Sequence, residues 1–221
     1  INISLRYLTG SLSGAVVQAI QNAINEARTK GAVVVAAAGN ENTDVGLYTP
    51  AALEGVITVS ATNEYDQPAE SYSGPFSNYG DEIDFSAPGE DIRSTYWYRT
   101  LGSNYEYESG TSMSAPFVSG LAALILAQDP LADYDDVLRR LKYSSKDLGA
   151  AGFDNYYGWG RIDAFKALSY DYYDNGTVKT QYLEAPDENG WHRLFCDAIG
   201  CMTGGAYVAL SGASGLVAGF L

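Results

Sequence analysis

The feature that most constrains the fold of this chain is an uninterrupted apolar run at residues 32–38, AVVVAAA, which a second apolar run at residues 56–61 follows. Strands that are apolar at every position are covered on both faces, as the strands of parallel sheets are. Before the first run, residues 14–30 repeat apolar side chains at spacings of three and four, which predicts an amphipathic helix. The order of elements predicts an α/β protein, a three-layer sandwich around a mostly parallel sheet.

Further elements follow from the same periodicities. Residues 1–5 alternate apolar and polar side chains, as a strand does. The segment 112–128 carries apolar side chains all round, which predicts a helix buried in the core on every side. We also predict helices at 134–143 and 161–168, and loops with short strands over the Gly-, Ser-, Asn- and Tyr-rich residues 63–111.

The length of 221 residues suits one large domain, or one domain with an appendage. From residue 169 onward the chain becomes polar and tyrosine-rich, and residues 202–221 carry no charge. We therefore predict a domain at residues 1–168 and a C-terminal extension of unknown role at residues 169–221. Because the chain starts inside a strand-like run, at Ile1 rather than at a methionine, we expect a processed or truncated piece of a longer protein.

The tail of the chain allows several interpretations. Residues 202–221 are long enough to cross a bilayer as a helix, and Ser211, Gly215 and Gly219 form a face of small residues. The many glycines make this segment weakly hydrophobic for a membrane span, so packing on the domain or on a partner fits better, and the start of a further domain stays open. Cys196 and Cys201 allow a small disulfide loop or two free thiols.

The charge of the chain excludes one class of partner. The formal net charge is −14 and the sequence pI is about 4.3, so the surface repels phosphate backbones and we expect no nucleic-acid binding. Solubility is the simplest explanation of this acidity, and a saline or cation-rich environment or acid-rich calcium sites stay open.

The strongest chemical signal is the string at residues 108–120, ESGTSMSAPFVSG, in which Ser112 opens the long apolar helix. A serine hydroxyl is a poor nucleophile and needs an adjacent base. At a helix N-terminus, unpaired N–H groups and the helix dipole face the negative charge that develops during attack. Ser112 alone would be better explained as a helix N-cap, but the whole string favours a nucleophile.

A second signal, Asn40, follows directly after the first apolar run, in residues 33–41, VVVAAAGNE. An asparagine after a buried strand is common in turns because its side chain tolerates a left-handed backbone. Its order and separation from Ser112 favour a different role, the donation of a side-chain amide to an oxyanion.

These two strings resemble motifs of the subtilase family of serine proteases, namely the nucleophile motif G-T-S-x-[AS]-x-P and the segment ending in A-A-G-N. Further segments resemble the family in the same order along the chain, at residues 2–5, 48–61, 76–80, 86–89 and 158–164. The resemblance covers about residues 1–168 and implies the C-terminal part of a catalytic domain with a partial subtilisin-like fold.

The resemblance implies roles for particular residues. Ser112 would be the nucleophile, and the side chain of Asn40 would hold the oxyanion together with the backbone N–H of Ser112. The substrate would pair as a strand beside Ser4, Leu5 and Arg6, and Ala37, Ala38 and Gly39 would form the wall of the first specificity pocket. The family has glycines where Arg6 and Tyr7 stand, so these side chains would narrow the pocket or alter its charge.

The base that would activate Ser112 is not evident. The family's D-[ST]-G and H-G-T-H segments precede the strand at which this chain begins, so we expect an N-terminal segment of the same protease to supply the catalytic histidine and aspartate. The only histidine is His192, which we interpret as a surface or partly packed residue because the string around Ser112 lacks the second glycine of G-x-S-x-G. We expect this chain alone to be nearly inert.

Two functions follow as alternatives. The first is a serine endopeptidase that acts on a protein or peptide substrate and is secreted or at the cell surface, as the resemblance implies. The second is a catalytically inactive, subtilase-derived module for assembly or binding. No cofactor is required, and the resemblance allows calcium as a structural ion. We nominate no metal ligands, because Glu41, Asp44, Asp81 and Asp84 are interpreted as solvated loop carboxylates.

Overall fold

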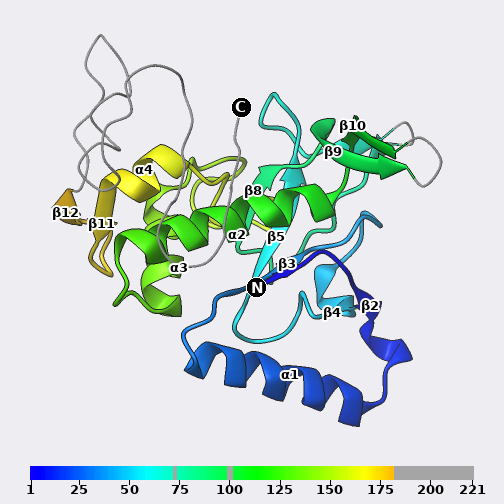
Figure 1. Ribbon diagram of the computed structural model, residues 1–221, viewed down its shortest axis with the longest axis horizontal. Coiled ribbons are helices and arrows are strands. Elements are labelled where there is room, and N and C mark those ends of the chain that lie inside the picture. Colours follow the sequence, from blue (N-terminus) through cyan, green and yellow to red (C-terminus); the bar gives the residue numbers. More distant parts are fainter. Residues whose placement is uncertain (72–73, 99–101, 182–221) are drawn as a thin grey trace.

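A four-stranded parallel sheet lies at the centre of the computed structural model, which describes residues 1–71, 74–98 and 102–181 (Figure 1). The strands lie side by side in chain order, and each pair of neighbours is parallel. They are β1 (Asn2–Ile3), β3 (Val34–Ala37), β5 (Val56–Thr62) and β8 (Phe85–Pro88). The predicted α/β class with a parallel sheet is confirmed.

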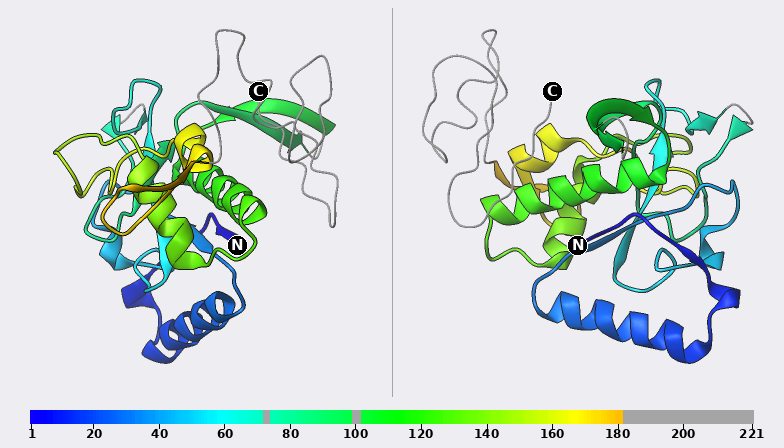
Figure 2. Two further views of the ribbon diagram at one scale, coloured as in Figure 1. Left: turned by 90° about the vertical axis from the view of Figure 1, so that its left-hand side faces the viewer. Right: turned by 45° about the vertical axis from the view of Figure 1, so that its right-hand side comes forward.

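The two faces of the sheet carry separate apolar cores, because successive side chains of a strand point in opposite directions. Val33, Val35 and Ala37 belong to one core, and Val34, Ala36 and Ala38 belong to the other. Helix α2 (Thr111–Gln128) covers the first face and α1 (Gly14–Thr29) lies on the second (Figure 2). Burial on both faces explains why the run at 32–38 contains no polar residue.

Helix α1 has the predicted extent. The side chain of Ser13 accepts a hydrogen bond from Val16 N–H at its start, and Lys30 ends it. Of its apolar stripe, only Ile24 is fully buried, while Val17 and Ile20 are half-buried.

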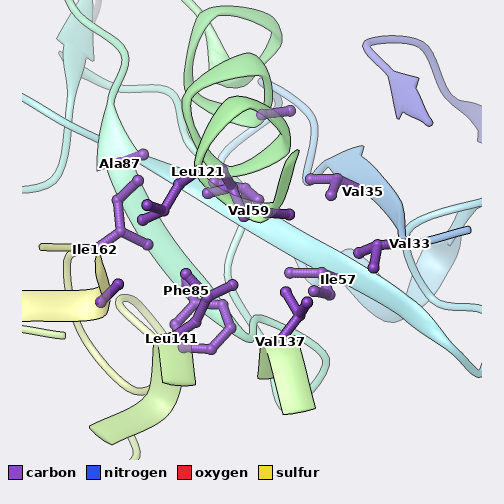
Figure 3. Close-up of a cluster of buried hydrophobic side chains, with 14 of the residues drawn as sticks. Val33, Val35, Ile57, Val59, Phe85, Ala87, Leu121, Val137, Leu141 and Ile162 are labelled. Carbon is purple, nitrogen blue, oxygen red and sulfur yellow. The ribbon is translucent and has the colours of Figure 1, made fainter. Parts of the chain in front are cut away.

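The prediction that α2 is buried on every side is wrong. Leu121 and Ile125 are buried in the first core, where Figure 3 shows Leu121 against the sheet, whereas Ala123 and Ala127 on the other side are exposed. With a mean hydropathy of 1.3, α2 is long and apolar enough to cross a membrane, a property that core helices share. The sheet, α3 (Tyr134–Ser144) and α4 (Ala164–Ser169) cover part of its circumference, which sequence composition does not reveal.

Local capping explains where the two later helices begin. Asp133 and Asp136 form a reciprocal capping box at the start of α3. Asp163 accepts a hydrogen bond of 2.9 Å from Lys166 N–H, so α4 begins at Ala164, three residues later than predicted. Before it, Arg161 is extended and exchanges backbone hydrogen bonds with Lys146.

An antiparallel hairpin projects from the body of the protein in the region predicted to hold only loops and short strands (Figures 1 and 2). Strands β9 (Ile92–Tyr98) and β10 (Gly102–Glu108) pair over seven residues each. Trp97, Tyr105 and Tyr107 stand on one face of this hairpin and are each more than half exposed. Four further strands have two residues each and form two small sheets. They are β2 (Tyr7–Leu8) with β4 (Tyr48–Thr49), and β6 (Glu70–Ser71) with β7 (Gly74–Pro75).

A second hairpin, β11 (Tyr170–Tyr172) and β12 (Val178–Gln181), packs against α3. Arg139 of α3 donates from Nε to the backbone oxygen of Tyr172 and lies 3.6 Å from the carboxylate of Asp171, which is only 4% exposed. The domain division at residue 168 stays a prediction. His192, both cysteines and residues 202–221 lie outside the described residues.

The contact between α3 and this hairpin gives a prediction on stability. We expect Arg139→Met to lower the free energy of unfolding by about 2–3 kcal/mol, because it leaves the buried Asp171 carboxylate without its nearest guanidinium. Lys179→Met is the matched control, since Lys179 pairs with the same carboxylate but is half-exposed, and it should cost clearly less than Arg139→Met. Denaturant unfolding measures both variants. Equal losses of unfolding free energy in Arg139→Met and Lys179→Met would contradict the view that Arg139 is the main partner of Asp171.

The interpretation of Asp84 as a solvated loop carboxylate is wrong. Its carboxylate accepts a hydrogen bond of 2.7 Å from Thr58 N–H, between β5 and β8. Burial raises the pKa of Asp84 from 3.8 to about 7. The unfolded chain therefore releases this proton at a lower pH than the folded chain does.

Stability should depend on pH through Asp84. Between the unfolded pKa of 3.8 and the folded pKa of about 7, the free energy of unfolding should fall as the pH rises. Asp84→Asn should remove this slope and stabilise the protein above the folded pKa by on the order of 4 kcal/mol. Urea unfolding across this range checks the prediction, with the exposed Asp81→Asn as control. An unchanged slope in Asp84→Asn would exclude Asp84 as its source.

Candidate active site

Ser112 is the second residue of α2, at the end of the helix that points toward the loop after β8. Two hydrogen bonds fix this end: Gly110 N–H donates to the Gly89 oxygen at 2.7 Å, and Ser114 Oγ donates to the Ala87 oxygen at 3.0 Å. The N–H of Ser112 belongs to the first turn, whose N–H groups have no acceptor within the helix. It is therefore oriented for an external negative charge.

The side chain of Asn40 is held at the same end of α2. Its Oδ1 accepts hydrogen bonds from Thr111 N–H at 2.9 Å and from Thr111 Oγ1 at 2.8 Å. The hydroxyl of Thr111 in turn accepts from Gly39 N–H at 3.0 Å. Since both bonds engage the oxygen of the amide, they determine its orientation and leave Nδ2 directed away from Thr111.

The position of Nδ2 follows from Gly110. This glycine has a φ of 155°, and a β-carbon on it would lie 3.1 Å from Asn40 Nδ2. The amide donor of Asn40 thus lies across Gly110, beside the first turn that carries the N–H of Ser112. Two donors and a hydroxyl are gathered at one helix end, which is the arrangement that stabilises an oxyanion formed on attack by Ser112.

The segment predicted to bind substrate contacts Ser112 directly. Ser4 Oγ donates to the backbone oxygen of Ser112 at 3.0 Å, and Ser112 Oγ lies 3.5 Å from the backbone oxygen of Ser4. Leu5 and Arg6 continue from this contact and are exposed. Ser4 and Ser112 are 108 positions apart in sequence, so only the folded chain brings them together.

The three residues predicted to form the wall of the specificity pocket do not share one face of the sheet. Ala37 and Ala38 are 3% and 0% exposed, and their side chains lie in the two cores on opposite faces of the sheet. Gly39 lies two residues beyond the end of β3 and precedes Asn40. That these residues line a pocket stays a prediction from the resemblance.

Sequence analysis assigned no role to two residues that organise the loop after β3. Asn78, which is 1% exposed, accepts from Glu41 N–H at 2.9 Å and from Thr43 N–H at 3.2 Å. Its Nδ2 donates to the Ala38 oxygen at 2.9 Å. Thr111 is the second such residue, because its hydroxyl accepts from Gly39 N–H and donates to Asn40 Oδ1. The segment 76–80 was recognised as a motif, but no local pattern shows which loop an asparagine will hold.

The loop carboxylates do not gather into a metal site. Among residues 1–71, 74–98 and 102–181, no three His, Cys, Asp or Glu side chains form a group that could hold a metal ion. Glu41 forms an ion pair with Arg6, and Asp44 accepts from Gly46 N–H at 2.8 Å. Calcium stays a prediction from the resemblance.

Comparison with known proteins identifies relatives of this chain. A model of the subtilase family matches residues 1–160. A thermophilic serine proteinase from a Bacillus species is 40% identical over 151 residues, which are 68% of this chain and 34% of that protein. An extracellular serine proteinase from a Thermus species is 42% identical over 143 residues, which are 65% of this chain and 32% of that protein.

A solved protease structure from Pseudoalteromonas arctica superposes with a TM-score of 0.64 at 37% identity, covering 76% of this chain and 49% of that structure. The chain thus spans about a third of the length of the two relatives named above. The family match covers most of the chain and includes Ser4, Asn40 and Ser112. This chain belongs to the subtilase family.

Proposed function

We propose that this chain is the nucleophile-bearing part of a serine endopeptidase that cleaves protein or peptide substrates. The observation that carries the proposal is the pair of hydrogen bonds from Thr111 to Asn40 Oδ1, which directs the Asn40 amide toward the helix end where Ser112 lies. A binding module has no physical need for this arrangement, whereas acyl transfer does.

The mechanism follows from these positions. Ser112 Oγ attacks the carbonyl carbon of the scissile peptide, and the carbonyl oxygen gains a negative charge. Asn40 Nδ2–H and Ser112 N–H donate hydrogen bonds to this oxyanion. The proton of Ser112 passes to a histidine and then to the leaving amine as the C–N bond breaks. A water molecule then hydrolyses the ester that links the substrate to Ser112.

The proposal assigns the histidine and its aspartate to an N-terminal segment of the same protease. Its support is the length of the relatives, of which this chain spans about a third, and the position of β1. Within the described sheet, β1 pairs with β3 alone, so its outer edge is free to accept a strand. Without that segment, we expect only the weak residual catalysis that substrate binding and the oxyanion hole provide.

The proposal also places the protein outside the cell, secreted or at the cell surface. Its support is that one of the relatives is named an extracellular proteinase. The net charge of −14 favours solubility and is therefore compatible with this location, but it does not distinguish this location from others.

A fluorophosphonate probe tests the function. The natural protein is isolated intact with any segment that precedes Ile1, treated with the probe, and digested for mass spectrometry. We expect the probe on Ser112, together with peptides from an upstream segment that contains a histidine and an aspartate. No label on Ser112 in a folded sample would refute the protease and favour the inactive module for assembly or binding.

A further inference from the structure

An ion pair bridges the two segments that flank the nucleophile. Arg6 follows Ser4, which contacts Ser112, and Glu41 follows Asn40, which carries the oxyanion donor. Arg6 Nε donates to Glu41 Oε2 at 2.8 Å, and Nη2 of the same guanidinium forms a salt bridge with Oε1. The pair therefore spans the space between the segments on either side of Ser112.

Several contacts hold this pair in place. The carboxylate of Glu41 accepts hydrogen bonds from Asn40 N–H and from Asn78 Nδ2, each at 3.1 Å. The guanidinium of Arg6 lies 5.7 Å from the centroid of the Tyr48 ring. The side chains of Arg6 and Glu41 are 39% and 29% exposed. The two side chains are thus held by several polar contacts while part of each stays open to solvent.

The pair lies against the backbone of Gly39. A β-carbon on this glycine would stand 2.8 Å from Arg6 Cδ and 2.8 Å from Glu41 Oε2. A methyl group on Gly39 would collide with both side chains of the ion pair and with Asn78 Nδ2. The side chains of Arg6 and Glu41 thus already occupy the space beside Gly39.

The chemistry of acyl transfer determines which substrate group reaches this space. The carbonyl carbon of the cleaved bond must lie at Ser112 Oγ, and its oxygen must lie between Ser112 N–H and Asn40 Nδ2. The α-carbon of the residue before the bond is one bond away from that carbonyl carbon. Its side chain therefore enters between the segments that contact Ser112 and Asn40, where Arg6 and Glu41 meet.

From this geometry we infer that the Arg6–Glu41 pair restricts the residue before the cleaved bond to glycine or alanine; the inference rests on the proposed protease function. An acidic side chain would be repelled by Glu41 and a basic one by Arg6. A large apolar side chain would have to displace the pair or remove its water. Glycine and alanine leave both charges paired, so specificity results from exclusion.

Peptide cleavage by the intact natural protein tests the inference. Four peptides differ only in the residue before the cut, which is alanine, phenylalanine, glutamate or lysine. We expect kcat/KM for the alanine peptide to exceed the other three by about tenfold or more. In Arg6→Gly, the unpaired Glu41 should raise kcat/KM for the lysine peptide about tenfold, and the phenylalanine peptide should also improve.

The opposite substitution gives the opposite change. Glu41→Gln leaves the charge of Arg6 unpaired, so kcat/KM should rise for the glutamate peptide and not for the lysine peptide. A merely structural loss would lower all four values together and would not reverse the charge preference. Arg93→Gly, on the exposed β9–β10 hairpin, is the control and should leave the ranking of the peptides unchanged.

The outcomes separate this inference from the proposed function. Cleavage of the phenylalanine, glutamate or lysine peptide as fast as the alanine peptide by the unsubstituted protein would overturn the inference and leave the protease established. An unchanged charge preference in both folded variants would also overturn it. Cleavage of none of the peptides, with no fluorophosphonate label on Ser112, would refute the protease and the inference with it.

Discussion

The substitution Ser112→Ala is expected to lower the turnover of the intact natural protein by about 10⁶-fold and to abolish labelling by fluorophosphonate. That magnitude was measured in a subtilisin, a member of this family, and is carried over to this chain. The reason is chemical: without the hydroxyl no covalent ester forms, and only substrate binding and the oxyanion donors still lower the barrier. Turnover of a peptide substrate and probe labelling are the two measurements.

A serine on the same helix provides the control for this experiment. Ser119 lies in α2 and donates from Oγ to Asn2 Oδ1 at 3.0 Å, away from the first turn that holds Ser112. Ser119→Ala should keep turnover within a fewfold of the unsubstituted protein. Unchanged turnover in Ser112→Ala would mean that another residue, or another protein in the preparation, performs the hydrolysis.

The substitution Asn40→Leu is expected to lower kcat by about 10²–10³-fold with little change in KM. This range also comes from a subtilisin. In the proposed mechanism, Asn40 Nδ2 donates to an oxygen that carries full negative charge only after Ser112 attacks, so its loss should affect the transition state more than the bound substrate. Steady-state kinetics on one good peptide substrate separate the two constants.

Thr111→Val and Asn22→Ala complete this second experiment. Thr111→Val removes the hydroxyl that donates to Asn40 Oδ1 but keeps the backbone donor, so the loss in kcat should be smaller, about tenfold. Asn22, on the exposed side of α1, should have no effect when replaced. A KM that rises while kcat stays constant in Asn40→Leu would show that Asn40 binds substrate and does not hold the oxyanion.

Much of the central fold can be read from local patterns. The run at residues 32–38 predicts a strand covered on both faces, and the structure places Val35 and Val34 in separate cores. The stripe of Ile20 and Ile24 predicts α1 within one residue of its bounds. These predictions succeed because hydrophobic periodicity depends on backbone geometry that repeats over a few residues.

Other features depend on neighbours that are distant in sequence. The apolar composition of α2 does not show that Ala123 and Ala127 face outward, since this depends on where the sheet and α3 lie. The length of the β9–β10 hairpin was also missed, because residues 63–111 as a whole are rich in Gly, Ser and Asn, which favour loops, although the two strands themselves carry Tyr, Trp and Thr side chains that favour strands.

At the candidate active site, the sequence by itself nominated Ser112 and Asn40, because a serine at a helix start and an amide after a strand each lie within a short motif. Only the tertiary structure decided which way the Asn40 amide points and that Arg6 pairs with Glu41. Those bonds join residues 71 and 35 positions apart. Short motifs encode local backbone shape, whereas the partner of a side chain is set only when distant segments pack together.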